Sequence, residues 1–299
     1  MQQELLIAIF TGLGAMLGWG FADFFAKKTI DRVGSIVSLV WAHLFGTLAF
    51  SLIALYQSVV IGQQLSIPTD MAGWGLLIFF GVLQALIYLL VYIGFGKGQL
   101  AVLNPVFASY SGLAALLSIT LLGEKVSASI LLAVAVIFGG ILLLNLDSQA
   151  LRSRRLNLIH IPGLKEIGLA VILAAIWTVS WDQFVGGKDW LTYALFMYIF
   201  MTLTAVIISK LQRVNLGVVK PHLWKFLILI GLGEVIAYSA ISLGFSVTSF
   251  TSIIAVLSGA FSLPTIILAH IFLKERVSSI QRAGTFIIIA GIVILSMRN

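Results

Sequence analysis

The stretch GLGEVIAYSAISLGF occupies residues 231–245, and GVLQALIYLLVYIGF at 81–95 repeats its pattern. Four residues keep their type and place in both copies: Gly81 and Gly231, Tyr88 and Tyr238, Gly94 and Gly244, and Phe95 and Phe245. Each copy lies in an apolar run long enough to cross about 30 Å of hydrocarbon. The pair therefore indicates a membrane protein that contains its transmembrane unit twice.

The repeat continues on both sides of this segment. LGEKVS at 122–127 matches LKERVS at 273–278, and GGILLL at 139–144 matches AGIVIL at 290–295. Nearer the start of each half, LGWGFADFF at 17–25 lies over AIWTVSWDQ at 175–183, which places Trp19 over Trp177. We expect a first repeat at 1–147, a basic linker at 148–166 and a second repeat at 167–299.

The composition agrees with a chain that lies mostly within a membrane. Hydrophobic residues make up 60% of the 299 residues, charged residues make up 10%, and the mean hydropathy is +1.11. A soluble domain of this composition would expose too much apolar surface to water, and the apolar runs are too long for barrel strands. The chain has no cysteine, which excludes disulfides, thiolate metal sites and thiol nucleophiles.

Apolar runs bounded by polar residues, glycine or proline predict ten helices. Their expected limits are 4–26, 34–56, 71–96, 100–122, 126–146, 167–186, 190–209, 223–245, 249–273 and 277–297. Each repeat has five helices, an odd number, so the second repeat enters the membrane upside down relative to the first. The predicted fold is an all-α integral membrane protein of ten transmembrane helices in two inverted five-helix repeats, typical of alternating-access transporters.

The basic residues predict the orientation of these helices. Of the 18 Lys and Arg residues, only Lys125, Lys188 and Arg298 lie away from the odd-numbered loops and their flanks. Cytoplasmic loops carry such an excess, so we expect these loops in the cytoplasm and both termini outside a plasma or inner membrane. This orientation accounts for the formal charge of +7 without a nucleic-acid partner.

The motifs of both halves resemble the EamA-type repeat of the drug/metabolite transporter superfamily. The resemblance rests on YIGFGKG, NPVF, LGEKVS and GGILLL in the first half and on the run from ISLGF to AGIVIL in the second. It implies a central cavity walled by helices 1–4 and 6–9, with helices 5 and 10 at the periphery, where relatives often form a homodimer contact. Members carry amino acids, sugars, nucleotide sugars, choline and drugs. The motif residues Glu124 and Glu275 lie at helix ends, which favours a structural role.

Polar residues in the middle of the predicted helices form a candidate site. Glu234 and Gln84 take equivalent places in the two repeats, and Tyr238 and Tyr88 follow four residues later on the same helix faces. A carboxylate at mid-bilayer costs roughly 2.5–3.5 kcal/mol on insertion scales, and such groups are functional by default. We expect Glu234 to bind and release a proton during transport. The alternative is a protonated Glu234 that only hydrogen-bonds a neighbouring helix.

Aromatic and acidic residues on the first helix of each repeat extend this site. Trp19 and Asp23 share one helix face, as do Trp177 and Trp181. Ring faces and charge suit an organic cation, although Asp23 at this spacing can instead pair with Lys27. The predicted substrate-binding residues are Trp19, Asp23, Gln84, Tyr88, Asn104, Trp177, Trp181, Glu234 and Tyr238, and the proton-coupling candidates are Glu234, Asp23 and His43.

These features predict a secondary active transporter that moves a small organic metabolite by alternating access. Export of an amino acid or a related compound is the leading expectation, and a proton-coupled exporter of organic cations or drugs is the alternative. An intramembrane lipid-modifying enzyme would need clustered acids or a nucleophile–base pair, whereas the eleven acids are scattered along the chain. The expected partners are the substrate, membrane lipids and protons, with no metal or cofactor.

Overall fold

The computed structural model describes residues 2–97, 103, 106–146, 162–274 and 277–296. The first half contains α1 (Gln2–Val33), α2 (Ser35–Val59), α3 (Met71–Lys97), α5 (Tyr110–Leu121) and α6 (Ala128–Asn145). The second half contains α8 (Leu164–Val185), α9 (Trp190–Leu211), α10 (Trp224–Val247), α11 (Thr251–Gly259), α12 (Ser262–Leu273) and α13 (Ser279–Ser296). Most of the predicted linker at 148–166 lies outside the described residues.

The described part of the chain is all-helical, as predicted. It contains nine helices that are long and apolar enough to cross a membrane, and the apolar segment Val106–Leu121 is a shorter tenth. Two short 3-10 helices, η2 (Leu216–Val218) and η3 (Pro221–Leu223), precede α10. The architecture is therefore the expected multi-pass helical bundle.

Three spans have limits that differ from those expected, one of which is the span expected over 100–122: its helix α5 begins at Tyr110, and the expected start at 100 lies outside the described residues. The first helix, expected over 4–26, continues to Val33. The span expected over 249–273 is divided into α11 and α12. Pro264 has no N–H to donate to the carbonyl of Ala260, which accepts instead from Leu263 at 2.9 Å in a tighter turn. The break leaves Phe261 at the wall of the central cavity.

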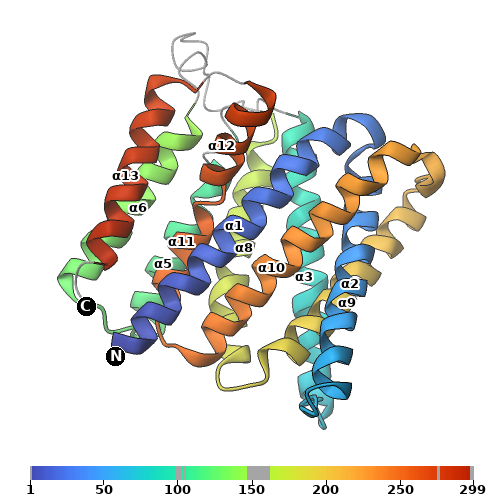
Figure 1. Cartoon of the computed structure of the whole chain (residues 1–299), viewed down its shortest axis with the longest axis horizontal. Coiled ribbons are helices and arrows are strands. Elements are labelled where there is room, and N and C mark those ends of the chain that lie inside the picture. Colours follow the sequence, from blue (N-terminus) through green and yellow to red (C-terminus); the bar gives the residue numbers. More distant parts are fainter. Residues whose placement is uncertain (1, 98–102, 104–105, 147–161, 275–276, 297–299) are drawn as a thin grey trace.

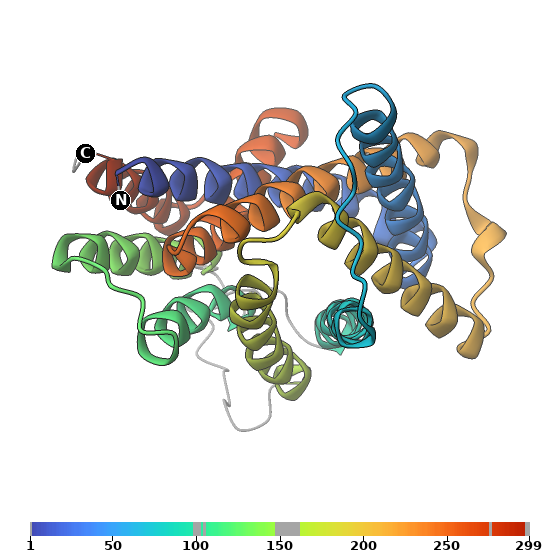
Figure 2. The same cartoon turned by 90° about the horizontal axis from the view of Figure 1, so that it is seen from below.

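The main helix contacts between the two halves have equivalent contacts in which the two repeats change places. α1 packs on α10 as α8 packs on α3, and α2 packs on α10 as α9 packs on α3. α2 also meets α9, and α6 meets α13, so each of these pairs joins equivalent helices. α1 and α8 run in opposite directions (Figure 1), which makes the repeats inverted. Figure 2 shows α1 and α10 on one face of the bundle and α3 and α8 on the other.

Glycines allow the main helix pairs to cross closely. A Cβ atom on Gly18 would lie 2.6 Å from the carbonyl oxygen of Gly233 in the α1–α10 crossing. In the α6–α13 crossing, a Cβ atom on Gly284 would lie 2.8 Å from the carbonyl oxygen of Gly140. Small residues of this kind bring membrane helices together through van der Waals contact. The α6–α13 pair stands at one edge of the bundle (Figure 1), where the resemblance places helices 5 and 10.

Candidate functional site

A cavity of about 130 Å³ lies at the centre of the bundle, with walls from both repeats. Five of the predicted substrate-binding residues line it: Trp19, Asp23, Gln84, Tyr88 and Trp177. The remaining aromatic lining residues, which are not among the predicted substrate-binding residues, are Tyr92, Phe107, Tyr110 and Phe261. Asp23 is exposed whereas Trp177 is only 3% exposed. The cavity therefore opens towards the C-terminal end of α1 and is closed beneath Trp177.

Three other predicted residues lie around the cavity without lining it. The ring of Tyr238 packs edge-on against Trp19 and Trp177, with centroid distances of 5.5 and 6.2 Å. The Tyr238 hydroxyl accepts a hydrogen bond from Gln84 Nε2 at 2.9 Å. Trp181 stacks on Trp177 at 5.6 Å, on the side away from the opening.

Glu234, the third of these residues, lies deeper and is 5% exposed. Asn104, the ninth predicted binding residue, lies outside the described residues, as does Glu275.

Glu234 belongs to a buried cluster with His43 and Tyr198. The Tyr198 hydroxyl donates to Glu234 Oε2 at 2.5 Å, and His43 Nε2 lies 3.4 Å from the same oxygen. His43 Nδ1 lies 2.7 Å from the carbonyl oxygen of Leu39. A carbonyl only accepts, so Nδ1 carries the hydrogen. Nε2 and the carboxylate would then face each other as two acceptors unless one of them holds a proton.

This cluster lies where the equivalent helices α2 and α9 meet. FGTL at 45–48 aligns with FMTL at 200–203, so His43 is equivalent to Tyr198 and Thr47 to Thr202. The two threonine hydroxyls are 2.9 Å apart, and the His43 ring stacks on Tyr198 at 5.3 Å. Tyr198 was missed by our reading of the sequence, and this short alignment is the signal that could have found it.

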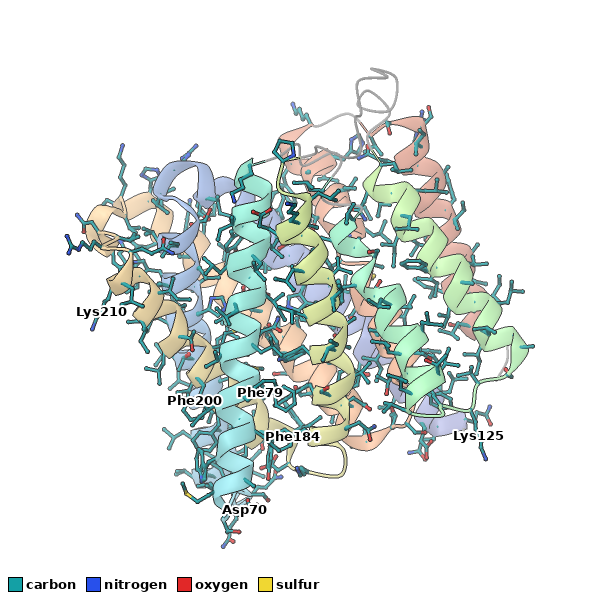
Figure 3. The ribbon with its side chains drawn as sticks, turned by 180° about the vertical axis from the view of Figure 1, so that it is seen from behind. Asp70, Phe79, Lys125, Phe184, Phe200 and Lys210 are labelled. Atoms are coloured by element: carbon teal, nitrogen blue, oxygen red, sulfur yellow. The ribbon has the colours of Figure 1, made fainter. Side chains whose placement is uncertain are left out.

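A stack of aromatic rings closes the space beneath the cavity. Phe80 lies 5.3 Å from both Trp181 and Phe184, and Trp181 is fully buried. At the end of the stack, the Lys188 ammonium lies 3.9 Å from the centre of the Phe184 ring. Burial lowers the pKa of Lys188 from its usual value, an effect that the charge of Asp70 partly opposes. Figure 3 shows Phe184 and Asp70 towards this end of the bundle.

Glu124 joins the two halves at the same end of the bundle. Its carboxylate accepts from the backbone N–H of Ser252 at 2.9 Å and from the Ser252 hydroxyl at 2.6 Å. It also accepts from the Ser118 hydroxyl at 2.5 Å. Ser252 lies in the first turn of α11, where the exposed N–H groups and the helix dipole favour a carboxylate. An open hollow of about 660 Å³, separate from the central cavity, borders Glu124.

Among the described residues that line the central cavity, one side chain carries a formal charge. Asp23 is the only Asp, Glu, Lys, Arg or His among the residues that line it in the described part of the chain. Two buried polar atoms of lining residues have no hydrogen-bond partner, namely Trp19 Nε1 and Gln84 Oε1. The cavity is thus aromatic, singly acidic, and bordered by polar groups that the protein itself leaves unused.

Comparison with known proteins identifies the family. The model of the EamA-like transporter family matches residues 6–146 and 163–297. No curated protein matches the chain. A solved structure titled only "Crystal structure of protein" is 15% identical, covers 97% of both chains and superposes with a TM-score of 0.79, which shows the shared fold. The family match over both halves shows that the chain belongs to the EamA-like transporter family, a group of multi-pass membrane transporters.

Proposed function

We propose that the protein is a secondary active transporter that moves a small organic solute across a plasma or inner membrane by alternating access. The central cavity between the inverted halves is the observation that carries this proposal. One end of the cavity is open beside Asp23, while the aromatic stack and Glu124 close the other end. Substrate sites of inverted-repeat transporters lie at such a repeat interface near the midplane.

The distribution of basic residues supports export as the direction of transport. The cavity opens towards the C-terminal end of α1, and the loop there belongs to the set that carries the Lys and Arg excess. This excess supports an orientation with the open end in the cytoplasm and both termini outside. A cavity that loads from the cytoplasm suits an exporter. An amino acid is less well supported as substrate, because no cationic side chain lines the described cavity wall to pair with its carboxylate.

We also propose that the His43–Glu234 pair holds the coupling proton. Because His43 Nδ1 is bonded to Leu39, the unbonded Nε2 is the ring nitrogen that lies 3.4 Å from the Glu234 carboxylate, and we place the coupling proton between these two groups. The pair is joined to the cavity by packing, because Tyr198 contacts Tyr238 edge-on at 5.4 Å and Tyr238 is bonded to Gln84. A substrate that displaces Gln84 would therefore shift Tyr238 and Tyr198, and so change the surroundings of the proton on the His43–Glu234 pair.

Purified protein in liposomes tests this function. A thermal-shift panel of amino acids, nucleosides, sugars and quaternary amines identifies ligands, since a bound ligand stabilises the folded state. An imposed pH gradient should then drive accumulation of the ligand by the wild type and by Glu166→Gln, a control in the exposed Lys97–Glu166 pair. Glu234→Gln should exchange ligand without responding to the gradient. An equal response by Glu234→Gln and wild type would disprove proton coupling through this pair.

A further inference from the structure

The lining of the central cavity indicates the class of solute that it binds. Seven of its thirteen described lining residues are aromatic: Trp19, Tyr88, Tyr92, Phe107, Tyr110, Trp177 and Phe261. The face of an aromatic ring is electron-rich and attracts a cation, and the attraction grows when the cation is desolvated. Ile87, Val91 and Ala174 add aliphatic side chains, and the remaining lining residues are Asp23, Gln84 and Thr178. Most of these lining side chains present carbon, and among the described lining residues the one formal charge is negative.

The charges around the cavity have the sign that such a solute needs. Asp23 contributes the only formal charge of the described lining, and it lies at the open end, where an arriving solute meets it first. Glu234 lies behind the wall, bonded to Tyr198 and beside His43. A cation entering past Asp23 passes into an aromatic enclosure without meeting a positive side chain among the described lining residues.

We propose that the cavity binds a monovalent organic cation whose charge is surrounded by carbon, such as a tertiary or quaternary ammonium. This rests on the proposed function of the cavity as the substrate site. The charge is attracted by Asp23 and the ring faces, and the alkyl groups pack against the aromatic and aliphatic wall. Trp19 and Asp23 share one face of α1 and act as the residues that determine specificity.

Two ligands of equal shape and different charge test this proposal. They are (2-hydroxyethyl)trimethylammonium and its neutral carbon isostere 3,3-dimethylbutan-1-ol, and binding is measured by thermal shift and tryptophan fluorescence. The cation should bind wild type at least tenfold more tightly than the isostere. Asp23→Asn and Trp19→Leu should each weaken cation binding about tenfold or more, and Trp19→Phe should weaken it less because a ring remains. Asp70→Asn, the same change at the far end of the bundle, should bind like wild type.

The other outcomes separate this proposal from the proposed function. Equal binding of cation and isostere would overturn the cation proposal. Specific binding and transport of an uncharged or zwitterionic solute, with no binding of the cation, would overturn the cation proposal while the transporter function stands. If no solute of the panel binds and none is transported, both the cation proposal and the proposed transporter function are overturned.

A second inference follows independently from a broken symmetry between two indole groups. Trp177 Nε1 donates to the carbonyl oxygen of Phe80 at 3.1 Å and so ties α8 to α3. The equivalent residues in the other pair of helices are Trp19 on α1 and Ile230, which precedes GLGE as Phe80 precedes GVLQ. Trp19 Nε1 is buried and has no hydrogen-bond partner. One half therefore makes a bond that its counterpart lacks.

The missing bond lies on the side where the cavity opens. Inverted repeats reach the opposite-facing state when one repeat rocks against the other around the fixed site, so contacts at one end open as the equivalent contacts at the other end close. We infer that in this state Trp19 Nε1 donates to the carbonyl of Ile230, while Trp177 Nε1 releases the carbonyl of Phe80. The two tryptophans then act as a reciprocal pair, because each stabilises one state by satisfying its own buried donor.

Cysteine labelling tests this exchange, since the chain has no native cysteine. Thr251→Cys, 2% exposed at the closed end, and Val91→Cys, in the cavity wall, report the two ends with an impermeant thiol reagent. Trp177→Phe should speed labelling at residue 251 at least threefold and slow it at residue 91. Trp19→Phe should have the opposite effect at both positions, and the control Trp190→Phe should change neither.

Shifts in the same direction for Trp19→Phe and Trp177→Phe would overturn the reciprocal exchange. The reciprocal exchange would also be overturned if Trp19→Phe labelled at the wild-type rate. The Trp19 indole N–H would then have no role in the change of state and would only bind substrate. The paired reporters separate either result from misfolding, since a misfolded protein labels faster at both positions.

Discussion

At the scale of single residues, the site depends on the surroundings of one carboxylate. Glu234 is buried, accepts a short hydrogen bond from Tyr198, and faces His43. The sequence located Glu234 because an acid in an apolar run is conspicuous, and it located Gln84 through the repeat. It did not indicate that Tyr198 is the residue that holds Glu234, because tyrosine is common in membrane helices and carries no charge.

The bond from Tyr198 should contribute measurably to stability. Tyr198→Phe removes the donor and leaves the Glu234 carboxylate with an unmet acceptor, which typically costs about 1–3 kcal/mol. We expect a lower midpoint of thermal unfolding in detergent. Tyr193→Phe, on the same helix, should have a smaller effect on stability because Tyr193 is only partly buried. Its phenyl ring would also keep the cation–π contact with Lys188. Equal midpoints for both variants would contradict the assigned role of Tyr198.

At the scale of helices, the bundle is assembled by close crossings of equivalent elements. Most helix limits came within a few residues of those expected where polar loops bound an apolar run, although α1 continues to Val33 through the polar residues expected to end it. They failed at the division into α11 and α12, because a proline inside an apolar run changes backbone bonding without changing hydropathy. The glycines of the crossings were visible in the sequence, but the partner that each one meets was not.

The α6–α13 crossing offers a matched pair of glycines. A Cβ atom on Gly140 would lie 2.8 Å from the backbone nitrogen of Ile288, whereas one on Gly139 would meet nothing within 4 Å. Gly140→Ala should destabilise the protein by about 1–3 kcal/mol through overpacking. Gly139→Ala should be neutral or stabilising, because alanine is the better helix former by roughly 1 kcal/mol. Unfolding midpoints measure both, and similar losses would show that the crossing tolerates a methyl group.

At the scale of the whole molecule, one end is closed by contacts between the halves. The Glu124 carboxylate, from the loop that follows α5 in the first repeat, binds the start of α11 in the second repeat. The aromatic stack of Phe80, Trp181 and Phe184 fills the space beside α3 and α8. An alternating-access cycle must separate these contacts to release solute at this end.

Loss of the Glu124 contact should favour opening of this end. Glu124→Ala leaves the Ser252 N–H and hydroxyl and the Ser118 hydroxyl without this acceptor. Labelling of Thr251→Cys should become several-fold faster in this background. Glu4→Ala, in the wall of the same hollow, serves as control and should leave the rate unchanged. An unchanged rate in Glu124→Ala would show that the aromatic stack alone closes this end.

The sequence by itself determined the membrane class, the number of spans, the inverted repeat and the intramembrane acid. These are properties of hydropathy, spacing and internal similarity, which are read along one dimension. The tertiary structure decided which of the predicted residues meet. Trp19 and Trp177 reach one cavity, while Trp181 lies beneath it and Glu234 lies behind its wall beside His43 and Tyr198. Helices distant in sequence supply these contacts, and their crossing geometry, set by backbone packing at small residues, determines which side chains face one another.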